Sequence, residues 1–327
     1  MLAPDAQKAL ARFELTLPSE LLVSPQIFSV RTIDLCSGRT AYYQRFYLNL
    51  DRRRFDEWLI SLIPQETALF RGFRCKSIER ADGVFRVTLT DLSSPEHTET
   101  LCARRIIGAD GADSLVRRTF YPEFSTKLRR YVSIQQWFRI PKPSFVPGER
   151  AAASGFAPFY SCIFDPSATD CYSWAISKDD CLIFGGAYPA KGCRERFEEQ
   201  KKRLAQFGFD LSEPFFTEAC QVLRPTSFFS FLTGGDGVFL IGEAAGFISP
   251  SSLEGISSAI ESARLLARTL NGGKNASGRS AAKRYARAVL PIRLRLTLKL
   301  LKCPFMYSPR LRRLVMASGI SAIKPEL

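Results

Sequence analysis

The chain has 327 residues, a formal net charge of +14, 46% hydrophobic residues and 24% charged residues. These values are ordinary for a globular protein, and the length allows about two domains with a substantial core. No uninterrupted apolar stretch of these residues is long enough to span a bilayer.

Cysteine and histidine usage narrows the chemistry further. None of the nine cysteines falls in a CxxC pair, and His97 is the only histidine, so the composition argues against a zinc site. An odd cysteine count without a secretory segment near Met1 favours reduced cytoplasmic thiols. We assign His97 to an exposed turn, which leaves no histidine to act as an acid or base.

The first third of the chain is predicted to alternate between helix and strand. Apolar spacing indicates a helix over 5–13, and aromatic–polar alternation indicates a strand over 40–50. Asp51 can cap a helix over 52–62 that stops at Pro64. Residues 70–90 and 99–107 read as a β-meander that leads into Gly108.

The middle of the chain is predicted to form an antiparallel sheet, which we expect to be a substrate domain. Short aromatic-rich segments, separated by Pro, Gly and Asp, lie at 131–138, 159–164, 172–176 and 182–187. A charged helix over 194–207 and a strand over 218–223 follow. Period-two spacing places Tyr172 and Trp174 on one sheet face, where they line a cavity or pack in the core.

The most informative segment begins with the apolar run 237–241. It leads into a small-residue corner that carries one acid, Gly242-Glu243-Ala244-Ala245-Gly246, and then into an amphipathic helix. In open α/β sheets such a corner lies at the carboxyl end of a strand, where ligands bind. The small residues admit a bulky ligand, and Glu243 can accept hydrogen bonds from a sugar-like hydroxyl. The segment therefore predicts a nucleotide-cofactor site and an enzyme.

A helix is expected to open directly after Pro250. Its first backbone N–H groups, around Ser251, Ser252 and Leu253, would then stabilise negative charge on a bound cofactor.

Two further segments point the same way. Residues 105–118 run from an apolar strand through Asp110-Gly111 into a basic helix, and residues 51–59 read Asp-Arg-Arg-Arg-Phe-Asp-Glu-Trp-Leu. In order and rough spacing, the three segments resemble the ribityl-binding, Asp-Gly and Asp-Arg-x-x-Phe-Asp motifs of the flavoprotein hydroxylase and geranylgeranyl reductase superfamily. The resemblance covers nearly the whole chain.

The resemblance implies FAD as the cofactor and assigns roles to individual residues. Glu243 stands where the family usually has aspartate, so its longer side chain must retract or shift the ribityl contact. Asp110 looks like the residue that supports the cofactor, and Arg52 like a cation beside the flavin. The full set of expected cofactor-binding residues is Arg52, Asp110, Gly111, Gly242, Glu243, Ala244, Ala245, Gly246, Pro250, Ser251, Ser252, Leu253, Glu254 and Gly255.

One family element is missing from the printed residues. The superfamily opens with a strand, a Gly-x-Gly-x-x-Gly turn and a helix that hold the ADP half of FAD, and no segment here has that spacing. We therefore expect an N-terminal βαβ unit to be absent, with Met1 an internal methionine. Such a loss would remove the pyrophosphate cradle and uncover apolar surface on neighbouring elements.

For the substrate, residues 171–176 resemble the Tyr-x-Trp-x-Phe-Pro element of geranylgeranyl reductases, although Ile176-Ser177 replaces Phe-Pro. In that family the element faces a prenyl channel. The resemblance implies that Tyr172 and Trp174 bind a hydrophobic or lipid substrate. Without a catalytic histidine, the proton for the substrate carbon would come from water, a cysteine or a tyrosine, and we select Tyr172.

Much of the excess positive charge lies after Ala263, among alternating leucines. Such a tail suits the surface of an anionic membrane, or its leucines pack on the core while its cations are solvated. No helix-turn-helix, RNP-like aromatic pattern or zinc module is present, so no nucleic-acid partner is expected.

Together these observations predict an α/β fold: an FAD/NAD(P)-binding doubly wound sheet, incomplete at its N-terminus, with an antiparallel-sheet substrate domain and C-terminal helices. The expected parts are 1–119 (FAD-binding, first part), 120–232 (substrate domain), 233–270 (ribityl and flavin motif) and 271–327 (basic helical tail, entered by a linker over 271–275). The favoured function is reduction of carbon–carbon double bonds in an isoprenoid-like substrate by reduced FAD, with NAD(P)H or a ferredoxin-type protein as electron donor. The alternatives are a flavin-dependent aromatic monooxygenase, or an inactive remnant or non-enzymatic binding protein. The expected location is the cytoplasm, with peripheral membrane contact left open.

Overall fold

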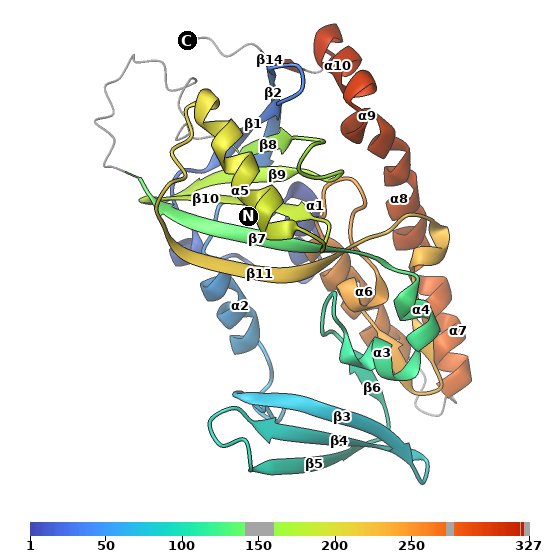
Figure 1. The fold of residues 1–327 in the computed structure, drawn as a ribbon. Helices are drawn as coiled ribbons and strands as arrows, with labels where there is room; N and C mark the ends of the chain where they lie inside the picture. The colour runs from blue at the N-terminus through green and yellow to red at the C-terminus, as the bar shows by residue number, and fades with distance from the viewer. Residues whose placement is uncertain (141–159, 273–277, 321, 324–327) are drawn as a thin grey trace.

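The computed structural model describes residues 1–140, 160–272, 278–320 and 322–323, and its largest element is an eight-stranded mixed sheet (Figure 1). The strand order is β11-β7-β10-β9-β8-β1-β2-β14. The strands span Ile27–Asp34 (β1), Arg39–Tyr47 (β2), Arg129–Arg139 (β7), Tyr160–Phe164 (β8), Ser173–Lys178 (β9), Cys181–Tyr188 (β10), Pro214–Arg224 (β11) and Ala322–Ile323 (β14).

The strands predicted between residues 131 and 223 are confirmed, but the sheet is not purely antiparallel. Strand β1 pairs in parallel with β8, with Val30 opposite Tyr160. The sheet therefore continues across the 119/120 boundary into β1 and β2. Strand β1 was not predicted, because its buried residues do not alternate strictly along the strand. Phe159 and residues 273–275 of the expected linker lie outside the described residues.

One face of the large sheet is covered by α5 (Cys193–Leu204), which continues as the 3₁₀ turn η3 (Ala205–Phe207). Phe197 of this helix stacks on Phe184 with 5.2 Å between ring centroids. Gln200 accepts hydrogen bonds from Ser173 (2.6 Å) and Tyr188 (2.5 Å) at the buried surface. Every residue of β10 is buried, as expected for a strand in the centre of a covered sheet.

A second, three-stranded sheet carries the predicted nucleotide corner. It consists of β12 (Gly234–Gly235), β13 (Val238–Leu240) and β6 (Ile106–Gly108), and β13 runs parallel to β6 with Leu240 opposite Gly108. Because parallel strands end at the same edge, the turns after β6 and β13 open toward one side. The surrounding helices are α3 (Leu115–Phe120), α4 (Pro122–Thr126), α6 (Ile256–Asn271) and α7 (Gly278–Ala288).

The predicted β-meander is confirmed as a separate sheet of β3 (Phe73–Ala81), β4 (Val84–Asp91) and β5 (Thr98–Ala103). The N-terminal helices are α1 (Pro4–Ala11), which packs on α6, and α2 (Arg52–Ser61). Asp51 caps α2 as expected, with its carboxylate accepting the Arg54 N–H at 3.1 Å. The 3₁₀ helices η1 (Ser19–Leu21) and η4 (Phe228–Ser230) complete the connections.

After α7 the chain forms a column of helices along one edge of the molecule (Figure 1). These are α8 (Leu290–Lys299), the 3₁₀ turn η6 (Leu300–Lys302), α9 (Cys303–Tyr307) and α10 (Pro309–Ser318). The helical prediction for this region is confirmed, with Pro291 in the first turn of α8, where its missing N–H costs nothing. A buried ion pair of 2.7 Å between Arg312 and Asp34 fastens α10 to β1.

No described helix is long and apolar enough to cross a membrane.

Candidate cofactor and substrate site

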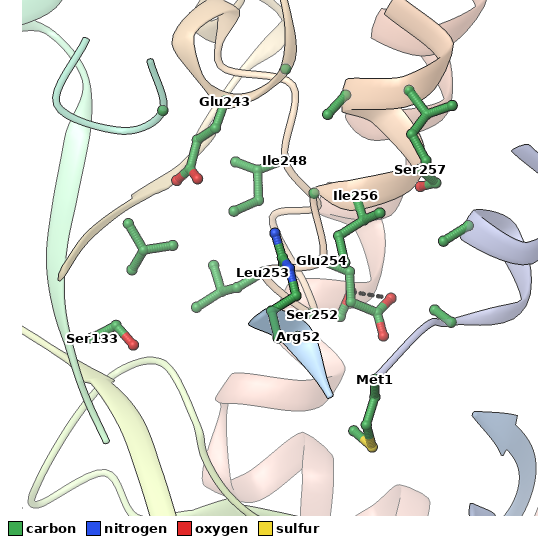
Figure 2. Close-up of a pocket in the computed structure, with 18 of the residues that line it drawn as sticks. Met1, Arg52, Ser133, Glu243, Ile248, Ser252, Leu253, Glu254, Ile256 and Ser257 are labelled. Atoms are coloured by element: carbon green, nitrogen blue, oxygen red, sulfur yellow. Dashed lines mark hydrogen bonds between the residues drawn. The ribbon is translucent and has the colours of Figure 1, made fainter. Parts of the chain in front are cut away.

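A cavity of about 570 Å³ lies where the two sheets and the N-terminal helices meet (Figure 2). One wall comes from the large sheet and includes Tyr172 and Trp174. A second comes from the turns after β6 and β13 and from the start of α6, and a third from α1 and α2. The predicted corner, the Asp-Gly segment and the Arg52 helix, far apart in sequence, therefore surround one space.

The corner after β13 is a short 3₁₀ helix, η5 (Gly242–Ala245). Gly242 has φ +55°, and a Cβ there would lie 3.1 Å from the Ala259 Cβ, so a larger residue would strain the packing of α6 against the corner. The Gly242 N–H donates to Ser262 Oγ at 3.0 Å. These contacts hold the corner against the first two turns of α6, and Gly242 lines the cavity.

Glu243 directs its carboxylate toward the cavity (Figure 2). One oxygen, Oε1, accepts the backbone N–H of Leu223 on β11 at 2.7 Å. Burial raises the pKa of Glu243 to about 7, against the lowering effects of the Leu223 N–H and the nearby Arg117 guanidinium. Near neutral pH this carboxyl can therefore both donate and accept a hydrogen bond at the cavity wall.

The remaining corner residues serve the fold. Ala244 and Ala245 are fully buried in the core beneath the corner and do not line the cavity. Gly246 has φ +81°, and a Cβ there would come within 2.3 Å of the Ser230 carbonyl oxygen. These three small residues were predicted to bind the cofactor; the structure places them where they allow the chain to turn tightly.

The helix predicted after Pro250 begins later, at Ile256. A turn intervenes, because Leu253 adopts φ +51° and donates its N–H to the Ser249 carbonyl at 2.9 Å. The Ser252 N–H donates to Ser249 Oγ at 3.3 Å. The N–H groups of Ser252 and Leu253 therefore close this turn, and the helix end that faces the cavity is formed by Ile256 and Ser257.

Within the loop that precedes α6, Ser252, Leu253, Glu254 and Gly255 line the cavity, whereas Pro250 and Ser251 do not. The Glu254 carboxylate accepts hydrogen bonds from Tyr47 (2.8 Å) and from Ser252 Oγ (3.0 Å). Arg45 lies 3.6 Å from the same carboxylate. Sequence reasoning missed Tyr47 and Arg45; their one indication was the aromatic alternation of residues 40–50.

The two residues of the Asp-Gly segment, Asp110 and Gly111, differ in their position relative to the cavity. The Asp110 carboxylate accepts Ser114 Oγ (2.5 Å) and the Val116 N–H (3.1 Å), so it holds the start of α3 and does not line the cavity. Gly111, with φ +73°, does line it, and a Cβ there would meet no atom within 4 Å. Asp110 was predicted to support the cofactor; its carboxylate lies outside the cavity lining.

Arg52 extends from the start of α2 and lines the cavity (Figure 2). Its Nε donates to Asp56 at 2.9 Å, and its side chain is more than half exposed. The cation therefore stands at the mouth of the cavity, where it can reorient toward an anionic group.

Tyr172 and Trp174 both line the cavity, and Tyr172 is buried at the same time. The Tyr172 hydroxyl donates to the Ser252 carbonyl at 2.5 Å and accepts from Tyr160 at 3.3 Å. Burial raises the pKa of Tyr172 well above its usual value, so the phenol keeps its proton at neutral pH. Trp174 Nε1 donates to Gln135 at 3.2 Å.

Of the other candidate side chains, Cys220 lines the cavity and His97 does not. His97 sits in the turn before β5 with an exposed side chain, 3.6 Å from Glu99. Within the described residues there is no cluster of three potential metal ligands, and the nine cysteines form no disulfide.

Solved structures share this architecture at low sequence identity. A geranylgeranyl bacteriochlorophyll reductase-like protein from Thermoplasma acidophilum matches with TM-score 0.75 and 14% identity, over 96% of this chain and 79% of that one. Klebsiella pneumoniae HpxO, complexed with FAD and uric acid, matches with TM-score 0.64 and 16% identity over 97% and 82%. PqsL of Pseudomonas aeruginosa, a probable FAD-dependent monooxygenase, gives 0.62 and 17% over 97% and 88%. The chain therefore has the fold of FAD-dependent oxidoreductases.

Closer relatives are found by sequence. Protein CbrA of Escherichia coli O9:H4 (strain HS) is 44% identical over all 327 residues, which span 83% of that protein. Protein CbrA of Shigella sonnei (strain Ss046) is 43% identical over the same residues and 86% of its length. The chain belongs to the CbrA family. No protein-family model matches it.

The raised pKa of Glu243 predicts a specific pH dependence of stability. The folded carboxyl keeps its proton up to about pH 7, whereas the unfolded one ionises near 4.5. The folded state therefore binds more protons between these values, and its free energy of unfolding should fall as the pH rises through this window, by up to about 3 kcal/mol.

In Glu243→Gln this loss should disappear, as measured by urea unfolding at several pH values between 4.5 and 8. Glu66→Gln, which removes an exposed carboxylate, serves as the control. If the wild-type and Glu243→Gln stabilities run parallel across this range, Glu243 is not the buried acid described above.

Proposed function

We propose that this chain is an FAD-dependent oxidoreductase and that its cavity holds the flavin and ribityl part of the cofactor. The main support for this proposal is that three features line the same cavity: the Gly242–Glu243 corner, Gly111 and the start of α6. They come from the ends of two parallel strands and from a helix N-terminus, which together form the usual ligand position in α/β sheets.

The residues present fit such a group. The cavity wall beside the Glu243 carboxyl group is made of small residues, which leave room for a bulky ligand. These residues are Ala109, Gly111, Gly242, Gly255 and Ala259. The α6 helix of 16 residues presents the positive end of its dipole there. The absence of a side chain at Gly111 and Gly255 keeps part of the cavity open, because a Cβ at Gly111 would meet no atom within 4 Å and one at Gly255 would first meet the Ile248 side chain at 3.7 Å.

When bound, the flavin would supply the hydride chemistry, and the chain would orient and insulate it. Glu243 would bind ribityl hydroxyls, Arg52 would approach from the cavity mouth, and the first N–H groups of α6 would favour negative charge nearby. Tyr172 would hold the proton for the substrate carbon, with Tyr160 donating a hydrogen bond to its oxygen.

For the substrate, we propose a hydrophobic, isoprenoid-like molecule whose carbon–carbon double bonds are reduced. The large-sheet side of the cavity carries the aromatic rings of Tyr47, Tyr160, Tyr172 and Trp174. Such a wall suits an unsaturated hydrocarbon chain better than a charged substrate. The reducing equivalents would come from NAD(P)H or a ferredoxin-type protein.

A flavin-dependent monooxygenase is the second candidate. It is favoured by the fold shared with PqsL, a probable FAD-dependent monooxygenase. The two reactions can be distinguished by their need for oxygen. A reductase works under anaerobic conditions with reduced flavin, whereas a monooxygenase consumes oxygen together with an aromatic substrate.

Flavin binding can be tested by filling the cavity. Gly255→Phe should lower the affinity for both FAD and riboflavin at least tenfold, because the ring would occupy the proposed flavin space. Gly255 has φ −120°, which suits any residue, and a Cβ there would only touch Ile248 at 3.7 Å, so the variant should fold. Binding is measured by quenching of flavin fluorescence. Ser93→Phe adds the same ring on an exposed turn and should bind as wild type. Equal affinities in all three proteins would contradict the proposed site.

The role of Tyr172 can be tested in an anaerobic assay with chemically reduced FAD and geranylgeraniol, in which mass spectrometry detects the gain of two hydrogens per reduced bond. Tyr172→Phe should lower kcat about 100-fold with little change in KM, since a proton donor acts in the chemical step. Flavin affinity, measured in the same preparation, should be retained. An unchanged kcat would exclude Tyr172 as the donor, and absence of reduction by the flavin-loaded wild type would overturn this substrate class.

A further inference from the structure

The helices that follow residue 277 carry most of the excess charge of the chain. Residues 278–320 contain eleven Lys and Arg and no Asp or Glu, in a chain whose total formal charge is +14. They form α7 and the column of helices that follows it along the edge of the molecule in Figure 1. Val289 donates its N–H to the Tyr285 carbonyl (3.0 Å) and accepts the Arg293 N–H at its own carbonyl (3.1 Å), so α8 follows α7 directly.

One side of this column is a continuous apolar ridge, which we call the leucine stripe. Its members recur every three or four residues, the spacing of one helix face. They are Leu290, Leu294, Leu298, Leu301 and Phe305, exposed by 42%, 49%, 63%, 68% and 53%. An exposed apolar ridge of this length marks an interaction surface.

The leucine stripe is not a part of the protein's own core. The core-facing side of α8 is formed by Ile292 and Leu296, each only 1% exposed, which pack with Tyr285 and Val289. Of the two interpretations of the basic tail, core packing therefore accounts for the inner leucines only. The leucine stripe lies on the solvent-exposed side of the column.

Cations accompany the stripe. Lys283 and Arg287 continue its helical spacing toward the N-terminus, and Lys302 follows Leu301 directly. All three are exposed, and none makes an ion pair with a carboxylate of the described residues. By contrast, Arg295 and Lys299 pair with Glu261 (2.9 Å) and Asp5 (3.6 Å) on the protein side.

We infer that the leucine stripe is a docking face for an anionic lipid bilayer. Apolar side chains would enter the boundary between headgroups and acyl chains while Lys283, Arg287 and Lys302 contact lipid phosphates, as in interfacial amphipathic helices. The complete lack of acidic residues over 278–320 favours an anionic lipid surface, because a protein partner would more commonly be matched by both signs of charge.

The opposite side of the column touches the cavity loop. Tyr307 donates its hydroxyl to the Ser251 carbonyl at 2.7 Å, and Cys303 Sγ contacts the Pro250 carbonyl at 3.5 Å. Ser252, the next residue, lines the cavity. Docking would therefore place the cavity wall about one helix diameter, roughly 10 Å, from the bilayer. This position suits a lipid substrate, but the docking inference does not depend on any reaction.

Co-sedimentation of the chain with vesicles tests the inference. Vesicles of phosphatidylcholine containing phosphatidylglycerol should bind it, and vesicles of phosphatidylcholine alone should bind at least tenfold more weakly. Leu298→Ser/Leu301→Ser should lower binding at least tenfold, and each of Lys283→Gln, Arg287→Gln and Lys302→Gln about fivefold. Because these side chains are exposed, thermal unfolding should be unchanged.

Matched controls make the result specific. Leu69→Ser/Leu92→Ser removes two comparably exposed leucines (50% and 56%) elsewhere, and Arg74→Gln/Lys76→Gln removes two exposed cations from β3. Both should bind as wild type. The inference is overturned if the controls lose binding equally, if anionic vesicles do not bind the chain, or if the stripe variants only abolish self-association, which would make a second copy the occupant.

Discussion

The guanidinium of Arg117 connects the two turns on which the cavity depends. It is fully buried, and it donates to the Ala244 carbonyl at 2.8 Å and to the Ala112 carbonyl. Burial lowers the pKa of Arg117 to about 10, so the group is still charged at neutral pH. Carbonyls of the turn after β6 and of the corner after β13 thus share one cation. Without Arg117, the Ala244 and Ala112 carbonyls would be buried without this hydrogen-bond donor.

This arrangement explains how segments more than a hundred residues apart form one wall. The parallel pairing of β6 and β13 brings their ends together, Asp110 holds the start of α3, and α3 carries Arg117 to the corner. Glu243 can then face the cavity while its backbone carbonyl lies 3.4 Å from the same guanidinium. A carboxyl in such an enclosed position gains a proton readily, which is the origin of its raised pKa.

Local features of this fold could be predicted from the sequence, whereas features set by distant contacts could not. The Asp51 cap and the helix over 52–62 depend on adjacent residues, and the structure confirms them. The start of α6 was misplaced because Leu253 adopts a left-handed backbone conformation that its residue type does not indicate.

For the site, the resemblance of three sequence motifs to one superfamily predicted that the corner, Gly111 and Arg52 surround one space, and all three line the cavity. The sequence pattern could not show that the exposed Asp110 carboxylate accepts a hydrogen bond from Ser114, or that Tyr47 reaches Glu254 across 207 residues of sequence. The leucine stripe was visible only as alternation of apolar and basic residues. Which leucines face outward depends on the packing of Ile292 and Leu296.

A crystal structure of this chain grown with FAD would show whether the cavity beside Glu243 is a flavin site. We expect electron density for the flavin ring system between Gly111, Glu243 and Gly255. Density for the ring at another position, or an empty cavity in crystals whose protein has bound stoichiometric FAD, would contradict it.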